Sequence, residues 1–192
     1  MAGCGYTIFD TAVGRCGIAW GDGGIIGVQL PETREIETRR RMLRQYPEAR
    51  ELAPPLNVEM AIYGIAALLR GEGADLSEVT LDMSGIHAFN ARVYAFARTI
   101  PRGETRSYGE VAAGLRATGA VHSVTQAISR NPFMIVVPCH RVLEAGGYAD
   151  KISPHGGTIS KRRLLSIEGA NMTFSKTLFD VLLPVAPPRP QG

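Results

Sequence analysis

Cysteine, histidine and arginine follow one another at residues 139–141, and these side chains suit nucleophilic chemistry. A thiol attacks as its thiolate, and positive charge from a neighbouring imidazolium or guanidinium favours that form. With three cysteines and four histidines in 192 residues, roughly 0.06 Cys-His pairs are expected by chance. We therefore predict that Cys139 is a nucleophile and that His140 is its partner.

Other interpretations of the cysteines stay open. Cys139 could be a core residue that happens to precede a histidine, since unpaired cysteines are among the most buried residues. Cys4 and Cys16 are expected to be packing or surface residues. No metal is expected, because a zinc site needs four ligands in close pairs and the sequence has no such cluster. An odd, sparse cysteine count argues against a disulfide framework and favours a cytoplasmic location.

The segment before the thiol should hold it rigidly. Residues 133–137 form a short apolar run, which predicts a buried strand, and Pro138 would end the hydrogen-bond ladder of that strand. Cys139 would then lie where a rigid element stops. No apolar run reaches 18 residues, so no membrane span is expected, and the N-terminus lacks the pattern of a secretory signal.

The first half of the chain, residues 1–84, is expected to be an α/β domain. Three short segments alternate like strands of a meander and are separated by glycine-containing turns, namely residues 6–9, 16–20 and 25–30. A polar helix over 32–46, an apolar helix over 58–69 and one more strand over 80–83 should follow. The arginines at 39–41 and 44 lie among glutamates and predict a solvated helix face.

The second half, residues 85–170, is expected to be mainly helical. A helix over 89–97 precedes a capping box, in which Ser107 caps a helix and Glu110 follows three residues later. That helix should run to about residue 117, turn at Thr118-Gly119 and be followed by a second helix over 120–130. Two short helices joined in this way predict a helix-turn-helix unit, although many helical hairpins bind nothing. Residues 161–168 form the last expected helix, and the proline-rich residues 171–192 should be an irregular extension.

Charge is distributed unevenly between the two halves. Residues 1–84 contain 8 basic and 12 acidic side chains, whereas residues 85–170 contain 11 basic and 5 acidic ones. Of the 21 basic residues, 18 are arginine, which suits phosphate recognition. The asymmetry indicates a polyanionic partner for the second half, although a genome-wide bias toward arginine would also explain the arginine content.

Four segments together resemble one known family, and the resemblance extends over about residues 6–170. The segments are residues 100–108 (IPRGETRSY), 131–132 (NP), 138–142 (PCHRV) and 161–169 (KRRLLSIEG). They resemble the alkylguanine-DNA alkyltransferases, also called methylated-DNA-protein-cysteine methyltransferases. The family fold is a ribonuclease-H-like α/β domain followed by a mainly helical, winged-helix-like DNA-binding domain.

The resemblance implies DNA repair by direct damage reversal. An alkyl group would pass from O-alkylated guanine, or thymine, in double-stranded DNA to Cys139, once for each protein molecule, because a thioether is not readily hydrolysed. Since the alkyl group cannot be reached inside a duplex, the damaged base must be turned out of the stack. The resemblance implies no cofactor, because the energy resides in the damaged base, and it implies a monomer.

The resemblance also assigns roles to individual side chains. His140 would take the thiol proton through a bound water, and Glu168 would orient the imidazole. Tyr108 would donate to the departing base, and Asn131 would act as a hinge between the second helix and Cys139. Simpler interpretations remain: a half-buried ring for Tyr108, a surface carboxylate for Glu168 and a helix stop for Asn131.

DNA contacts and a base pocket are implied as well. The expected DNA-binding residues are His122, Ser123, Thr125, Arg130 and Arg141. The expected pocket residues are Tyr108, Val137, Pro138, Ser153 and His155. His122 stands where the family usually has an arginine, and histidine has a shorter reach and little charge at neutral pH. The loop over 147–157 departs from the family pattern, so the choice among Tyr148, Ser153 and His155 stays open.

Two other classes compete with the repair alkyltransferase. One is a lesion-binding or regulatory helix-turn-helix protein with little transferase activity, which the altered second helix keeps open but the presence of Cys139 disfavours. The other is a cysteine hydrolase, which is disfavoured because adjacent residues seldom form a nucleophile–base pair and no oxyanion-hole pattern is evident.

Overall fold

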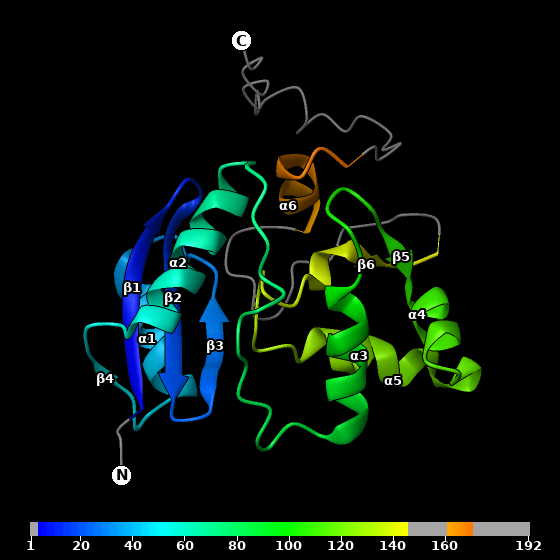
Figure 1. Cartoon of the computed structure of the whole chain (residues 1–192), viewed down its shortest axis with the longest axis horizontal. Helices are drawn as coiled ribbons and strands as arrows, with labels where there is room; N and C mark the ends of the chain where they lie inside the picture. Colours follow the sequence, from blue (N-terminus) through cyan, green and yellow to red (C-terminus); the bar gives the residue numbers. More distant parts are fainter. Residues whose placement is uncertain (1–3, 146–160, 171–192) are drawn as a thin grey trace.

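A computed structural model describes residues 4–145 and 161–170 of the chain (Figure 1). The first half contains a four-stranded sheet with the strand order β3-β2-β1-β4. Its strands are β1 (Gly5–Thr11), β2 (Gly14–Gly21), β3 (Gly24–Gln29) and β4 (Arg50–Glu51). The first three form the predicted antiparallel meander, and β4 pairs with β1 in parallel.

Two helices cover opposite faces of this sheet, α1 (Glu35–Gln45) and α2 (Leu56–Leu69) (Figure 1). Both match predicted helices. On the α1 face, Met42 packs with residues that include Tyr6 and Ala19, whereas the larger cluster on the α2 face includes Ile18 and Ile65. The two faces differ because successive strand side chains point in opposite directions. The sheet is therefore buried on both sides.

The predicted strand over residues 80–83 is wrong. Thr80 O accepts a hydrogen bond from Ile25 N at 3.0 Å, and Asp82 N donates one to Ile25 O at 2.8 Å. These bonds make only an isolated bridge between Ile25 and Leu81 at the outer edge of β3. The segment therefore lies along one edge of the sheet without forming a full ladder.

The predicted buried strand over residues 133–137 is also wrong, although all five side chains are buried. Phe133 forms a single parallel bridge with Val28 of β3, and the chain then folds back on itself. Val136 N bonds to Met134 O at 2.9 Å, and Val137 N bonds to Phe133 O at 2.8 Å. Ile135 lies at φ 71° in the left-handed region, which an extended strand excludes. An apolar run indicates burial, but it does not determine extension.

The second half is mainly helical, as predicted, and contains a small parallel pair of strands. Its elements are α3 (Ala88–Arg98), β5 (Arg106–Ser107), α4 (Tyr108–Gly114), α5 (Val121–Ser129), β6 (Val142–Leu143) and α6 (Lys161–Ile167). Two 3-10 turns, Thr118–Ala120 and Cys139–Arg141, complete the described part.

The capping box of α4 is confirmed, with Glu110 N donating to Ser107 Oγ at 3.1 Å and Ser107 N donating to Glu110 Oε2 at 2.6 Å. The helix ends at Gly114, three residues earlier than predicted. A Cβ at Gly114 would lie 2.3 Å from the ring of Phe96, so this position requires glycine for close packing on α3. The chain then turns through Arg116 and enters α5.

The core is continuous between the two halves of the chain. Tyr94 of α3 donates a hydrogen bond to Ala127 O of α5 at 3.0 Å, and its ring meets that of Phe133 edge-on at 6.1 Å. Val28 N of β3 donates to Pro132 O at 2.8 Å. The segment that leads to Cys139 is thus held between the sheet on one side and α3 and α5 on the other.

Candidate active site

Asn131 shapes the segment that ends at Cys139. Its side chain is fully buried, with Nδ2 donating to Val137 O at 3.0 Å and Oδ1 accepting from Phe133 N at 2.9 Å. One amide therefore closes the fold-back between the end of α5 and Pro138. Because both polar ends of the amide are used, this position requires asparagine rather than any residue that stops a helix.

Cys139 begins the 3-10 turn Cys139–Arg141 and is fully buried. Its Sγ lies 3.7 Å from Met134 Sδ. Burial raises the pKa of the thiol, while the charge of Lys161, the Asn131 side chain and two backbone amides act in the opposite direction. The net direction is upward, so the thiol keeps its proton until a base removes it.

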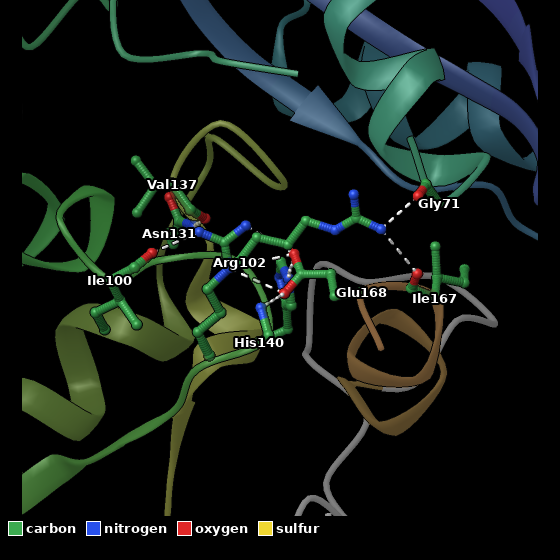
Figure 2. A network of polar contacts seen from close by, with 10 residues as sticks. Gly71, Ile100, Arg102, Asn131, Val137, His140, Ile167 and Glu168 are labelled. Carbon is green, nitrogen blue, oxygen red and sulfur yellow. Dashed lines mark hydrogen bonds and ion pairs between the residues drawn. The ribbon is translucent and has the colours of Figure 1, made fainter. Parts of the chain in front are cut away.

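His140, Arg141 and Glu168 form a buried polar cluster at the thiol-bearing turn. Figure 2 shows the His140 ring facing the Glu168 carboxylate. His140 Nε2 lies 2.7 Å from Glu168 Oε1. The Arg141 guanidinium donates to the same carboxylate at 2.8 to 3.2 Å and to Ile100 O at 2.6 Å. The backbone N–H of Gly103 also donates to Glu168 Oε2, at 3.4 Å. The carboxylate accordingly lies at the centre of the cluster.

Charges in this cluster set the protonation of its members. Burial raises the pKa of Glu168, but hydrogen bonds and positive charge from His140 and Arg141 outweigh that effect and hold it at about 2. Burial lowers the pKa of His140 more than the carboxylate raises it. A neutral imidazole that donates Nε2–H to Glu168 keeps a lone pair on Nδ1. That Nδ1 is buried and has no hydrogen-bond partner in residues 4–145 and 161–170.

Arg141 is not a surface residue, which corrects our expectation that it contacts DNA. Only 9% of it is exposed, and its guanidinium is committed to Glu168 and to Ile100 O. The sequence could not reveal this, because Glu168 lies 27 residues further along the chain. Arg102 connects two separate segments of the chain. Its Nη2 donates both to Gly71 O, just after α2, and to Ile167 O of α6 (Figure 2).

Lys161 is a site residue that the sequence reasoning missed. It is 9% exposed, and its Nζ donates to Val142 O at 3.0 Å and to Tyr108 Oη at 3.3 Å. The ammonium also lies 5.6 Å from the centre of the Tyr108 ring. The only sequence feature that pointed to Lys161 as a site residue is its position at the start of the KRRLLSIEG segment. A buried lysine directed at a tyrosine hydroxyl connects α6 to the first residue of α4.

The predicted DNA-binding side chains of α5 lie at its surface. His122 and Ser123 are exposed, as is Arg130 just beyond the helix, whereas Thr125 is partly buried and bonds to Val121 O at 3.0 Å. His122 Nε2 lies 2.9 Å from Gln126 Nε2, one turn along the helix. Except for Arg141, this predicted set therefore shares one helix and its end.

The structure describes three of the five predicted pocket residues. Val137 and Pro138 are buried immediately before Cys139, and Tyr108 is partly buried beside Lys161. Ser153 and His155, with Tyr148, lie outside the described residues. Within the described ranges, no group of three or more Cys, His, Asp or Glu side chains could hold a metal ion.

The fold places the buried thiol of Cys139 close to the helix pair α4 and α5. The polar side chains of His122 and Ser123 lie exposed on α5. Residues 88–170 match the family model of the 6-O-methylguanine DNA methyltransferase DNA-binding domain. The methylated-DNA–protein-cysteine methyltransferase of Methanothermobacter thermautotrophicus is 35% identical over 156 residues, which are 81% of this chain and 80% of that protein. The corresponding Mycobacterium bovis protein is 36% identical over 179 residues, or 91% and 98% of the two chains.

Solved structures give the same result. The crystal structure of Mycobacterium tuberculosis OGT in complex with DNA has a TM-score of 0.65 at 32% identity, covering 85% of this chain and 91% of that chain. The M. tuberculosis O6-methylguanine methyltransferase has a TM-score of 0.66 at 34% identity, covering 86% and 92%. This chain belongs to the methylated-DNA–protein-cysteine methyltransferase family. None of the helices in the described ranges is both long and apolar enough to cross a membrane.

Proposed function

We propose that this protein repairs double-stranded DNA by moving an alkyl group from the O6 atom of guanine to Sγ of its own Cys139. The observation that supports this most directly is the fully buried thiol between Asn131, Met134 and Lys161, adjacent to the His140–Glu168 pair. Family membership supports the same chemistry. The lesion-binding alternative has less support, because the relatives described above are named methyltransferases.

The first step is removal of the thiol proton. Burial favours the neutral thiol, so a base must lie close by. His140 fits this role, because its neutral ring donates Nε2–H to Glu168 and keeps the Nδ1 lone pair for a proton, received through a water molecule. As the imidazole becomes positive, the carboxylate of Glu168 stabilises it. Lys161 stabilises the thiolate from another side.

In the second step the thiolate attacks the alkyl carbon in line with the bond to O6. The new sulfur–carbon bond forms as the carbon–oxygen bond breaks, and the electron pair leaves with the guanine. Tyr108 donates a hydrogen bond to the departing base, while Lys161 donates to the Tyr108 oxygen and makes its O–H a better donor. Overall, the guanine gains the proton that the thiol loses. The thioether product ends the reaction after one turnover.

For this attack the damaged nucleotide must leave the duplex stack and enter a pocket beside Cys139. We assign the surface of α5, with His122, Ser123 and Thr125, to the DNA groove, and Arg130 to the phosphate backbone. Arg141 is reassigned from DNA contact to positioning of Glu168. The pocket assignment keeps Val137, Pro138 and Tyr108, and Ser153 and His155 remain candidates.

We further propose a ribonuclease-H-like first domain over residues 1–84, a winged-helix-like second domain over 85–170 and an extension over 171–192. The meander with its flanking helices and the α4–α5 unit support these finer descriptions. A reducing, cytoplasmic setting fits the chemistry, because Cys4, Cys16 and Cys139 are free thiols.

A duplex containing one isotopically labelled O6-methylguanine tests the function. We expect label to be fixed on the peptide that contains Cys139, at one equivalent per protein, with loss of transfer in Cys139→Ser. Cys16→Ser is the matched control, because burial raises the pKa of Cys16 to about 12 and makes it unreactive. Tight binding of the duplex without label transfer would instead support a lesion-binding protein.

A further inference from the structure

The helix pair assigned to DNA has almost no positive charge of its own. Neither α4 nor α5 contains a lysine or arginine, and α4 contains the acidic Glu110. Proteins gain most of their duplex affinity from Lys and Arg side chains that neutralise phosphates. In residues 108–129 only Arg116, in the turn between the two helices, is basic. Figure 1 shows this helix pair at the end of the molecule away from the N-terminal sheet.

Arg116 has a backbone conformation that disfavours arginine. Its φ is 54°, in the left-handed region, and its N–H bonds to Ala113 O at 2.9 Å as the chain leaves α4. Glycine adopts this conformation readily, whereas a residue with a Cβ is strained there. The side chain is exposed and has no hydrogen bond or ion pair within the described ranges. An arginine at a strained backbone position suggests that its charge has a function.

A second arginine reaches the same turn from a different helix. Arg92 of α3 donates from Nη2 to Leu115 O at 2.8 Å, and Leu115 immediately precedes Arg116. Arg92 is exposed, and its bond to Leu115 uses one of the five N–H groups of the guanidinium. No acidic side chain in the described part of the chain forms an ion pair with either arginine.

We propose that Arg92 and Arg116 form a binding site for backbone phosphate of duplex DNA at the α4–α5 turn. The inference rests on the proposed repair function and extends it to a site outside the reacting pocket. Both arginines belong to one turn, since Arg92 bonds to Leu115 O and Arg116 is the next residue, and a guanidinium binds phosphate oxygens through paired N–H donors. The contact is independent of base sequence, so it would position the helix pair along the backbone rather than read bases.

Salt-dependent binding of an unmodified duplex tests the pair. Arg116→Gly removes the charge and relieves the left-handed backbone, and Arg92→Gln removes the other charge. Each change should lower the slope of log affinity against log salt concentration by about 0.9. The ratio of wild-type to variant affinity should then be about 3.5-fold larger at 50 mM than at 200 mM salt. Arg116→Lys should keep the wild-type slope.

Controls separate a phosphate contact from loss of structure. Arg116→Gly should melt no lower than the wild type, and Arg40→Gln, which removes an exposed charge from α1, should leave the slope unchanged. Unchanged slopes for the Arg92 and Arg116 variants, an equal loss in Arg40→Gln, or a lower melting temperature for Arg116→Gly would overturn the proposal. Label transfer by the wild type reports on the repair function separately, so a failed repair function and a failed phosphate site can be told apart.

Discussion

Replacing Glu168 with glutamine is expected to affect stability and alkyl transfer together, because one carboxylate serves both His140 and Arg141. Its side chain is 6% exposed and accepts hydrogen bonds from both neighbours. Removing one member of a buried ion pair typically costs about 3 to 5 kcal/mol. The pKa of about 2, against an ordinary value of 4.5, corresponds to about 3 kcal/mol for the charged form. We therefore expect Glu168→Gln to lower the free energy of unfolding by about 3 kcal/mol.

The effect on transfer follows from the tautomer of His140. The carboxylate only accepts, so it holds the proton of the imidazole on Nε2 and leaves Nδ1 able to receive one. A glutamine whose carbonyl faces Arg141 directs its NH2 group at Nε2 and favours the opposite tautomer. The base would then be lost, and general-base catalysis typically contributes about 10²- to 10⁴-fold. We expect transfer to slow by about 10²-fold or more.

Two measurements check these expectations. Urea unfolding gives the stability change, and transfer from a methylated duplex under single-turnover conditions, at a temperature where the variant is folded, gives the rate. Glu104→Gln is the matched control, because that carboxylate lies in an exposed pair with Arg106 and should alter neither quantity appreciably. A folded Glu168→Gln protein that transfers the alkyl group at the wild-type rate would refute the proposed role of the His140–Glu168 pair.

Three further predictions concern the same site. Asn131→Ala leaves the buried Phe133 N–H without its partner and removes one of the two hydrogen bonds that Val137 O accepts, the other coming from Cys139 N. It should therefore lower the free energy of unfolding by about 2 to 4 kcal/mol in urea titrations, and a loss under about 1 kcal/mol would contradict its structural role. Lys161→Gln removes a charge that lowers the pKa of Cys139, so the pH of half-maximal transfer should rise, whereas Lys161→Arg should preserve it. Because the pKa of Glu168 is depressed, its stabilising contribution should be complete above pH 4.5 and lost as pH falls toward 2, as unfolding at several pH values would show. The same titration of Glu168→Gln should lack this component.

Much of the site could be predicted from neighbouring residues. The Cys139-His140 sequence and the capping box of Ser107 with Glu110 depend on residues one to three positions apart, and local hydrogen bonding acts over that range. The three-stranded meander followed from alternation and glycine turns, and the helices from apolar spacing. Family motifs then suggested partners that lie far apart in the chain, such as Glu168 for His140.

Packing decided the remainder. Residues 133–137 are apolar throughout, and only the contacts of Asn131 and the left-handed Ile135 make them fold back instead of extending. Arg141 could equally have faced solvent by sequence, but a carboxylate 27 residues away holds it inside.

Lys161 meets Tyr108 across 53 residues, a distance that no local pattern encodes. Sequence thus determined which groups could react and which segments would be helical or buried. The tertiary structure alone determined the partners of Arg141 and Lys161, because a buried charge needs a polar partner and only the fold brings that partner close.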